Sequence, residues 1–348
     1  MRFGNVILLG RPNVGKSTFL NGALGETLAI VSPVPQTTRD ALLGVVHRPN
    51  AQLAFVDTPG VHRPRSELGR RMNSAAMDAL PSADVVIFMT DVQGLAERAR
   101  RSGAPAENNS ADSTDPTHDR LLVPADVKLL DFVSREVPLI LAVNKIDLLR
   151  DKSLLLPLSQ AFHGLRAFQA IVPLSAKRDD DVARVLDVVE PLLPEGPPGY
   201  AEDDLTNRPT LFFVREYIRE QILLQTGREV PHAAAVTVDK FEASPKLTRI
   251  AATIHVEKVG QRKIIVGSSG HGIREIGRGA RLRIEALLGG RVHLELFVRV
   301  TPRWRNAPRQ LAEMGYDIGS GHTPSELADA APSRPHATGS RRAPRRTP

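Results

Sequence analysis

Short apolar runs alternate with amphipathic stretches from residue 1 to residue 198. The runs suited to buried strands lie at residues 6–9, 53–56, 85–89, 139–143 and 171–174. Buried strands separated by helices predict an α/β domain with a mostly parallel sheet and helices on both faces. In such a domain, ligand-binding loops lie at the carboxyl ends of the strands.

The pattern changes after residue 209. Apolar residues recur at helical spacing over residues 210–225, and residues 233–241 and 247–256 alternate as two strands. An apolar run then leads into Gly267-Ser268-Ser269-Gly270, a helical stretch to Leu288, a strand over 292–300 and a last helix near 306–314. This order of elements predicts a second domain, of the α+β class.

Proline, glycine and small polar residues mark the boundaries of these domains. Residues 194–199 contain too much proline and glycine to continue a helix or strand. We therefore assign residues 1–198 to the first domain, 199–209 to a linker and 210–316 to the second domain. Residues 97–120 and 317–348 lack the apolar residues that a core needs, so we expect a disordered insertion and a disordered basic tail.

The strongest chemical signal follows the first predicted strand, where G-x-x-x-x-G-K-[ST] matches Gly10-Arg11-Pro12-Asn13-Val14-Gly15-Lys16-Ser17, followed by Thr18. The N–H groups of such a loop face phosphate oxygens, Lys16 reaches the outer phosphates and Ser17 offers its hydroxyl to Mg²⁺. A helix starting at Lys16 adds its positive end. A glycine-rich turn without a ligand is the alternative, but the complete signature between strand and helix favours a nucleotide site.

Two later loops offer further groups to the phosphates. Residues 31–40 include two prolines that prevent a helix, and they present Thr37 and Thr38. Asp57-Thr58-Pro59-Gly60 follows the second apolar run, so Asp57 can hold a Mg²⁺ water and the N–H of Gly60 can face a terminal phosphate. Spacing alone does not distinguish Thr37 from Thr38 as a metal ligand.

Two motifs near the end of the first domain indicate the base. Asp147 in Asn144-Lys145-Ile146-Asp147 can accept hydrogen bonds from the N1–H and amino group of guanine, a pair of donors that adenine lacks. Leaving such a carboxylate unpaired is costly, so the arrangement selects strongly for guanine. Ser175-Ala176-Lys177 follows the next strand and can supply a backbone N–H for the base carbonyl.

Together these motifs resemble those of the translation-type GTPases, in the branch containing Era, the tRNA-modification GTPase and septins. The resemblance implies hydrolysis of GTP to GDP and phosphate, with catalytic roles for Lys16, Thr38, Gly60 and Asn13. It implies Mg²⁺ ligation by Ser17, Thr38 and Asp57, and it selects Thr38 over Thr37. It also implies that guanine is read by Asn144, Lys145 and Asp147.

Two residues inside these motifs bear on hydrolysis. Val61 occupies the position where many small GTPases carry glutamine, and its side chain cannot orient an attacking water. Asn13 matches an asparagine that in this branch helps to hold K⁺ beside the β- and γ-phosphates, where the ion can act like an arginine finger. The alternative for Asn13 is that it simply caps the phosphate loop.

The second domain resembles a KH domain of the bacterial type, type II, in which G-x-x-G lets an RNA backbone approach two helix ends. Gly267, Ser268, Ser269 and Gly270 form this motif, although its middle positions are usually basic or amide-bearing. Phosphate attraction then depends on neighbours such as Arg262, Lys263, Arg274, Arg278 and Arg281. A KH fold without RNA affinity is the alternative. Trp304 is expected to pack against the last helix rather than stack on a base.

Composition narrows the function further. The 348 residues include 46 Lys and Arg against 39 Asp and Glu, a net charge of +7 that favours a polyanionic partner or an acidic membrane face. The chain has no cysteine, which excludes disulfides, thiol catalysis and zinc–thiolate sites and suits a reducing cytoplasm. No apolar run approaches the roughly 18 residues that span a bilayer, and no export signal is visible. We therefore expect a cytoplasmic protein.

A GTPase domain followed directly by a KH domain resembles the Era-type GTPases from Asn5 to Tyr316. The resemblance implies a monomeric, GTP-switched factor that uses Mg²⁺ and K⁺, binds the 3′ end of small-subunit ribosomal RNA and assists maturation of the small ribosomal subunit. It also suggests peripheral association with the inner face of the cell membrane.

Two alternatives stay open at this stage. One is a P-loop kinase or ATPase with a small substrate, which Asn144 to Asp147 argue against and which competition between GTP and ATP would test. The other is an RNA- or membrane-binding module in which hydrolysis is negligible. Val61 favours this alternative, because its side chain cannot orient water. Turnover with and without potassium would distinguish that module from an active GTPase.

Overall fold

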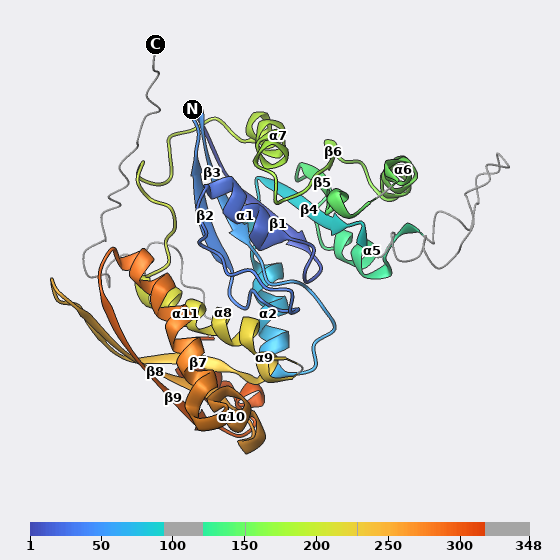
Figure 1. Cartoon of the computed structure of the whole chain (residues 1–348). Helices are drawn as coiled ribbons and strands as arrows, with labels where there is room; N and C mark the ends of the chain where they lie inside the picture. Colours follow the sequence, from blue (N-terminus) through green and yellow to red (C-terminus); the bar gives the residue numbers. More distant parts are fainter. Residues whose placement is uncertain (94–120, 150, 228, 317–348) are drawn as a thin grey trace, which may run out of the picture.

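The computed structural model describes residues 1–93, 121–149, 151–227 and 229–316. The predicted insertion at 97–120 and the predicted tail at 317–348 lie outside the described residues, so both stay predictions. The described residues form two domains, drawn in the upper and lower parts of Figure 1. None of the helices in these ranges is long and apolar enough to cross a membrane.

A six-stranded sheet forms the centre of the first domain, in the order β2-β3-β1-β4-β5-β6. Its strands are β1 (Arg2–Gly10), β2 (Leu42–His47), β3 (Ala51–Asp57), β4 (Val85–Asp91), β5 (Leu139–Asn144) and β6 (Ala170–Pro173). Neighbouring strands are parallel except for β2 and β3, which are antiparallel. The predicted mostly parallel sheet is confirmed, although the apolar pattern did not reveal β2.

Helices cover both faces of this sheet, as predicted. The helices α1 (Lys16–Leu24) and α7 (Asp179–Val189) pack on one face, whereas α5 (Pro124–Leu130) and α6 (Leu155–Leu165) pack on the other. Successive side chains of a strand point to opposite faces. In β1, Val6 and Leu8 therefore join one core, and Ile7 and Leu9 join the other. Burial on both sides holds the carboxyl ends of the strands, and the loops that leave them, in fixed positions.

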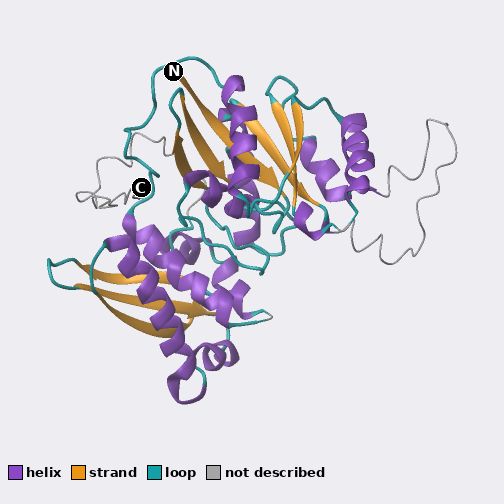
Figure 2. Ribbon diagram, turned by 45° about the horizontal axis from the view of Figure 1, so that its top comes forward, coloured by secondary structure: helices purple, strands orange, loops and turns teal. Residues whose placement is uncertain are grey.

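The second domain packs α8 and α11 against a three-stranded sheet of order β7-β8-β9. Its elements are α8 (Thr210–Gln225), α9 (Val230–Ala233), β7 (Ala235–Glu242), β8 (Thr248–Val256), α10 (Val259–Val266), α11 (His271–Leu288), β9 (Val292–Val300) and α12 (Pro308–Glu313). β8 is antiparallel to β7 and parallel to β9. The two sheets and the helices of the second domain can be followed in Figure 2.

Most of the elements predicted for this domain are confirmed. The helix at 210–225 and the strand at 292–300 have the predicted bounds. The predicted start of a strand at residue 233 is wrong, because Pro231 favours the first turn of a helix and α9 takes the residues up to Ala233. The apolar run before Gly267 forms the end of α10. Ile265 from this run packs in the core of the domain.

The segment predicted as a linker lies along the edge of the first sheet. Val45 of the edge strand β2 donates its N–H to the carbonyl of Leu205 at 2.9 Å. The side-chain oxygen of Gln52 accepts from the N–H groups of Gly199 and Tyr200 at 2.8 and 2.9 Å. These bonds tie the start of the second domain to the first, so the segment is packed rather than a free tether.

The two domains also share a buried apolar cluster. Leu68 and Met72 of α2 (Glu67–Asp78), the helix that follows Gly60, contribute the first-domain side. The second domain contributes Ala235, Trp304, Leu311, Met314 and Tyr316. Trp304 has no exposed surface, which confirms a packing role beside α12 and extends that role to α2. A helix placed directly after a phosphate-facing loop is thus in contact with the second domain.

Candidate functional site

Lys16 lies at the centre of the phosphate loop. Its Nζ donates to the carbonyl oxygens of Gly10 at 2.9 Å and Arg11 at 3.1 Å. Burial lowers the pKa of Lys16 to about 8, against the opposing charge of Asp57. A bound polyphosphate would favour the charged ammonium group again. The loop therefore presents a poorly solvated cation at the N-terminus of α1, which suits an anionic ligand.

The remaining loop residues are held by neighbours on both sides. Asn13 has a positive φ of 63°, and its Nδ2 donates to the carbonyl of Pro33 at 2.9 Å. Val14 is buried, and its carbonyl accepts from Nδ2 of Asn144 at 2.7 Å. Asn13 thus reaches the loop at 31–40, while Val14 is joined to the loop predicted to read the base. Thr18 follows in the first turn of α1.

Three oxygen-bearing side chains converge beside Lys16. The hydroxyl of Ser17 donates to Oδ2 of Asp57 at 2.6 Å. The hydroxyl of Thr38 lies 2.9 Å from that of Ser17 and 3.3 Å from Oδ2 of Asp57. Thr37 turns away, because its hydroxyl donates to the carbonyl of Val34 at 2.7 Å. The geometry therefore brings together the three predicted Mg²⁺ ligands and leaves Thr37 outside the cluster.

The chemistry of this cluster fits Mg²⁺. Asp57 is fully buried, and burial raises its pKa while the charge of Lys16 and the bonds from Ser17 and Thr38 lower it. Its second oxygen, Oδ1, is buried with no hydrogen-bond partner among the described residues. A buried carboxylate with a spare oxygen is costly unless a cation or its water approaches. Hard oxygen donors of this kind are those that Mg²⁺ prefers.

Residues 58–60 connect this cluster to the phosphate loop. The hydroxyl of Thr58 donates to the carbonyl of Leu8 at 2.7 Å, and Pro59 is buried. Gly60 approaches Pro12 so closely that a Cβ at position 60 would lie 2.6 Å from the Pro12 backbone. Only glycine fits this approach, and it lets the backbone N–H of Gly60 lie near the phosphate loop.

A contact between the two phosphate-facing loops was not anticipated from the sequence. Nε2 of His62 lies 2.8 Å from Nε2 of Gln36, and its Nδ1 lies 3.0 Å from the carbonyl oxygen of Gly60. Val61, in contrast, packs against the apolar core of the first domain. Its inward direction agrees with the view that this residue does not position water. Sequence offered no signal for the Gln36–His62 pair, since the two residues belong to different loops.

The residues predicted to read the base lie in two loops, which hydrogen bonds join. Oδ1 of buried Asn144 accepts from the N–H groups of Lys145 at 2.7 Å and Ala176 at 2.9 Å. The N–H of Ser175 donates to Asp181 at 2.8 Å. The carboxylate of Asp147 is exposed beside this framework, and Lys177 is exposed at its end. Asn144 and the amides of Ser175 and Ala176 therefore hold the two loops, while Asp147 is open to a ligand.

Two acidic residues that sequence reasoning missed link the phosphate loop to the base loop. Asp126 of α5 accepts from Nε of Arg11 and the hydroxyl of Thr90, both at 2.7 Å. Burial raises the pKa of Asp126, and the Arg11 charge opposes this effect. Asp91 lies 2.7 Å from Nζ of Lys145 and 3.7 Å from Arg11. One could have suspected Asp91 from its place after an apolar strand, but nothing local marks Asp126.

The KH loop has a different character. Gly267 has a φ of 69°, and a Cβ there would lie 2.7 Å from the N atom of Gly272, so glycine is required. Ser268 and Ser269 are exposed, and Gly270 precedes the first turn of α11. Arg274 donates from its guanidinium to the carbonyls of Gly270 and Ser269. The structure thus fixes one positive charge directly behind the loop, where the serines themselves carry none.

The other predicted RNA-binding cations lie on the same helices. Lys263 of α10 is exposed. Arg278 of α11 has a side chain 70% exposed, and its contact with Glu275 is a distant 4.0 Å. An exposed pair at this distance neutralises little charge in water. Lys263 and Arg278 can therefore contribute to a positive surface around the loop.

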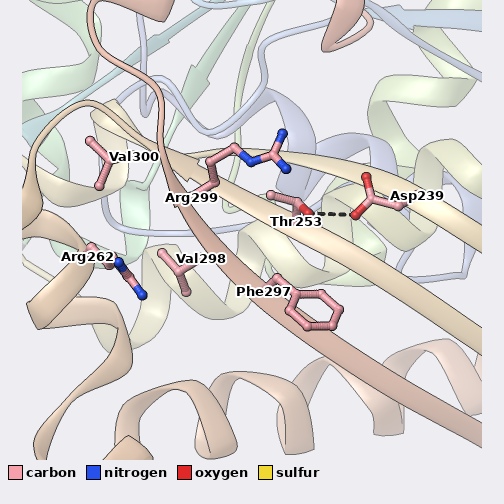
Figure 3. Close-up of a pocket in the computed structure, with 7 residues that line it drawn as sticks. All are labelled: Asp239, Thr253, Arg262, Phe297, Val298, Arg299 and Val300. Atoms are coloured by element: carbon pink, nitrogen blue, oxygen red, sulfur yellow. Dashed lines mark hydrogen bonds between the residues drawn. The ribbon is translucent and has the colours of Figure 1, made fainter.

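A hollow of about 460 Å³ lies beside the edge strand β9, close to α10 (Figure 3). Phe297, 56% exposed, lies on one side, and Arg262 of α10 lies on the other. The hydroxyl of Thr253 donates to Asp239 at 2.6 Å at its rim. Phe297 was not named from the sequence, although the alternation of exposed residues in β9 could have identified it.

Comparison with family models agrees with both domains. Residues 5–145 match the model described as a 50S ribosome-binding GTPase. Residues 229–305 match the model of a KH domain. The first match extends from β1 to the end of β5, and the second contains all three strands of the second sheet.

Curated relatives match about 90% of the chain. The chain is 38% identical to GTPase Era of Geotalea daltonii, covering 90% of this chain and 97% of the relative. It is 40% identical to GTPase Era of Lactobacillus helveticus, with 90% and 96% covered. For GTPase Era of Nostoc sp., identity is 40%, and 90% of each chain is covered.

Two solved structures are also similar over nearly their full length. One is a tyrosine-to-alanine variant of Aquifex aeolicus Era bound to GDP.AlF4⁻, with a TM-score of 0.79, 34% identity, and 91% of this chain and 99% of that chain covered. The other is Era in complex with MgGDPNP and nucleotides 1506–1542 of 16S ribosomal RNA, with the same TM-score and coverage at 33% identity. On this evidence, the chain belongs to the Era family of GTPases.

Proposed function

We propose that this chain is a GTP-switched RNA-binding factor that recognises the 3′ end of small-subunit ribosomal RNA and assists maturation of the small ribosomal subunit. The proposal depends mainly on one arrangement. Ser17, Thr38 and Asp57 lie together beside Lys16. The helix α2, which follows Gly60, packs against the KH domain. The Era structure with MgGDPNP and the 16S fragment supports the same pairing of ligands.

In the nucleotide site, each residue has a specific role. Lys16 and the backbone N–H groups of residues 13–18 bind the phosphates, and the exposed carboxylate of Asp147 accepts from guanine. Mg²⁺, when bound through Ser17 and Thr38 with Asp57 behind it, neutralises charge on the β- and γ-phosphates. A bound γ-phosphate would order the loops that carry Thr38 and Gly60. That change can reach the second domain, because both loops are connected to it.

Hydrolysis needs a positive charge beside the γ-phosphate and an oriented water, and the side chain of Val61 cannot orient that water. Asn13 faces the loop at 31–40 through its bond to Pro33, which supports its proposed role in holding K⁺ beside the phosphates. Lys16 adds its own positive charge at the outer phosphates. Turnover in KCl compared with NaCl tests this role, and we expect faster hydrolysis in KCl.

In the KH domain, an RNA backbone would approach Gly267 to Gly270, with Arg274 behind the loop and Lys263 and Arg278 beside it. Phosphate charge supplies most of the affinity in such contacts. The hollow beside β9, with exposed Phe297 and Arg262, is suited to an unstacked base.

The test is binding of a labelled RNA that matches nucleotides 1506–1542 of 16S ribosomal RNA, with the protein loaded with GDPNP or GDP at one fixed salt concentration. We expect tighter binding in the GDPNP state and weaker binding of an RNA of scrambled sequence. Arg278→Gln should weaken binding, whereas Arg309→Gln, which alters a 92% exposed side chain on α12, should not. Equal binding of both RNAs in both states would contradict the proposal.

A second candidate rests on Val61, whose inward packing leaves it unable to orient water. Under this alternative, the chain is an RNA- or membrane-associating module that binds GTP with negligible hydrolysis. Release of phosphate from GTP in KCl, measured with and without the RNA fragment, distinguishes the two. Cytoplasmic location, peripheral membrane association and a monomeric state stay predictions from the sequence.

A further inference from the structure

The side chain of Arg39, the residue after Thr38, extends from the first domain into the second. Its Nη1 donates to the carbonyl of Ala234 at 2.7 Å and to the Tyr316 hydroxyl at 3.1 Å. Its Nη2 donates to the carbonyls of Pro231 at 3.1 Å and His232 at 3.3 Å. Only 3% of the residue is exposed. We call the second-domain groups around this guanidinium the Arg39 socket.

The socket suits a guanidinium group better than any other side chain. The carbonyls belong to α9 and the residue after it, where a helix end leaves acceptors unpaired and carries partial negative charge. The aromatic rings of Trp304 and Tyr316 each lie 5.8 Å from the guanidinium carbon, within the range of cation–π attraction. Trp304 is itself fixed, because its Nε1 donates to the carbonyl of Ala233 at 2.9 Å.

Two arginines from the second half of the chain bind the loop that contains Arg39. Arg219 of α8, 1% exposed, donates to the carbonyl of Thr37. Arg208, directly before α8, donates to the carbonyl of Ala41. The contacts are therefore reciprocal: Arg39 binds carbonyls of the second domain, while Arg219 and Arg208 bind carbonyls on either side of it.

Thr38 lies inside this set of contacts. Its neighbours Thr37 and Arg39 are both held by the second domain, and consecutive Cα atoms are about 3.8 Å apart. The Thr38 hydroxyl meanwhile lies 2.9 Å from that of Ser17, in the proposed Mg²⁺ site. Thr38 cannot withdraw from that site by more than a few ångströms unless the contacts of Arg39 or Arg219 break.

We propose that Arg39 is a positioning residue for the nucleotide reaction: docked in its socket, it holds Thr38 at the Mg²⁺ and γ-phosphate site. This inference rests on the proposed role of Thr38 as a Mg²⁺ ligand. Contact of the second domain then strengthens binding of GTP but not of GDP, which has no γ-phosphate to engage the loop. By thermodynamic reciprocity, GTP strengthens the contact between the domains by the same factor.

The test compares full-length wild type with Arg39→Gln, Arg39→Lys and Arg208→Gln, and Arg309→Gln serves as the exposed control. Affinities for GDPNP and for GDP are measured at saturating Mg²⁺, and for the wild type also without Mg²⁺, together with the melting temperature of each variant. Arg39→Lys keeps the charge but loses the planar fork that satisfies several acceptors. Arg208→Gln changes a partly exposed side chain, so this variant should fold. It provides the test if the variants of buried Arg39 do not fold.

We expect both Arg39 variants to bind GDPNP about tenfold more weakly, with GDP affinity within about twofold of wild type. Arg208→Gln should lower the same GDPNP-to-GDP ratio by a smaller factor, about threefold, and Arg309→Gln should leave it unchanged. A role in folding alone would lower the melting temperature and weaken both nucleotides equally. An unchanged ratio in folded Arg39→Gln, or in Arg208→Gln if the Arg39 variants fail to fold, would overturn the inference.

The two possible failures have different signatures. If the wild type binds GDPNP without any dependence on Mg²⁺, the proposed nucleotide site itself is wrong. If the wild type requires Mg²⁺ for GDPNP but the variants keep its nucleotide ratio, only the positioning role of Arg39 fails.

Discussion

Both domains have a glycine-bounded loop at the start of a helix, and we propose a phosphate ligand for each, yet the two loops are built differently. The loop at 10–18 is held by residues far away in the chain, including Asp126 through Arg11 and Asn144 through Val14. The loop at 267–270 is held by residues close to it in the chain: the N–H of Gly267 donates to the carbonyl of Lys263, and Arg274 donates to the carbonyls of Ser269 and Gly270. One is an assembled, buried site and the other is an exposed local turn.

The difference teaches what each loop can do. In the buried site, groups such as Lys16 and Asp57 are desolvated before the ligand arrives, so each one acts strongly on a bound phosphate. At the exposed loop, water and salt screen every cation, so affinity accumulates from several weak contacts. Substitutions should therefore produce large effects at the first loop and graded effects at the second.

The largest expected effect is at Lys16. Lys16→Met should lower GTP hydrolysis by at least about 10³-fold, because it removes a preorganised charge from the phosphates. The same change should raise the melting temperature of the nucleotide-free protein, since a buried cation with a lowered pKa is costly to the fold. Phosphate release and thermal unfolding measure the two outcomes. A loss of both activity and stability would mean that Lys16 mainly supports the fold.

Asp147 should show the next largest effect, on base selection. Asp147→Asn should weaken GTP binding by about a hundredfold, because the amide cannot accept both guanine hydrogen bonds. The new amide donor can instead pair with the second carbonyl of xanthine, so affinity for xanthosine triphosphate should rise. Competition between the two nucleotides measures the change. If Asp147→Asn still prefers GTP, the base is read elsewhere.

A smaller effect is expected at Asn13. Replacing K⁺ by Na⁺ should slow hydrolysis by wild type about tenfold, the scale expected for losing one electrostatic contact in the transition state. Asn13→Ala should abolish this difference between the two salts while GDP binding remains. Equal rates in KCl and NaCl for the wild type would contradict a role in holding K⁺. The Asn13 side chain would then serve only to bind the carbonyl of Pro33.

The smallest effect should be at the KH loop. Arg278→Gln should weaken RNA binding about threefold and reduce the slope of affinity against salt by about 0.7. The ranking of RNA sequences should not change, since phosphate contacts carry little sequence information. Titrations at several KCl concentrations measure the slope. An effect of a hundredfold or a changed sequence preference would show that Arg278 contacts a base and that the comparison between the loops is too simple.

Sequence predicted the features that depend on local residue patterns. The strands with continuous apolar runs, the helix at 210–225 and each phosphate or base motif are of this kind. β2 was not predicted, although its sequence, LLGVVH, is apolar on both sides of Gly44 and its first five residues are buried. The glycine divides the run into two apolar pairs, each too short to stand out as a strand, and the antiparallel pairing with β3 joins them.

The residues that join distant parts of the chain could not be predicted. Arg39 stands in a polar loop, and its acceptors lie almost 200 positions later. Asp126 follows a stretch without periodicity, and only the folded sheet places it beside Arg11. Such contacts have no local signature, because the partners meet only after two hydrophobic cores have formed and the domains have packed.

The most direct test of the whole account is whether the two loops are thermodynamically coupled. Affinity for GDPNP would be measured with and without a saturating RNA that matches nucleotides 1506–1542 of 16S ribosomal RNA. The account predicts that the RNA strengthens GDPNP binding by the same factor by which GDPNP strengthens RNA binding, with little change for GDP. If the RNA binds while the affinity for GDPNP stays the same, the two sites act independently and the switch mechanism is wrong.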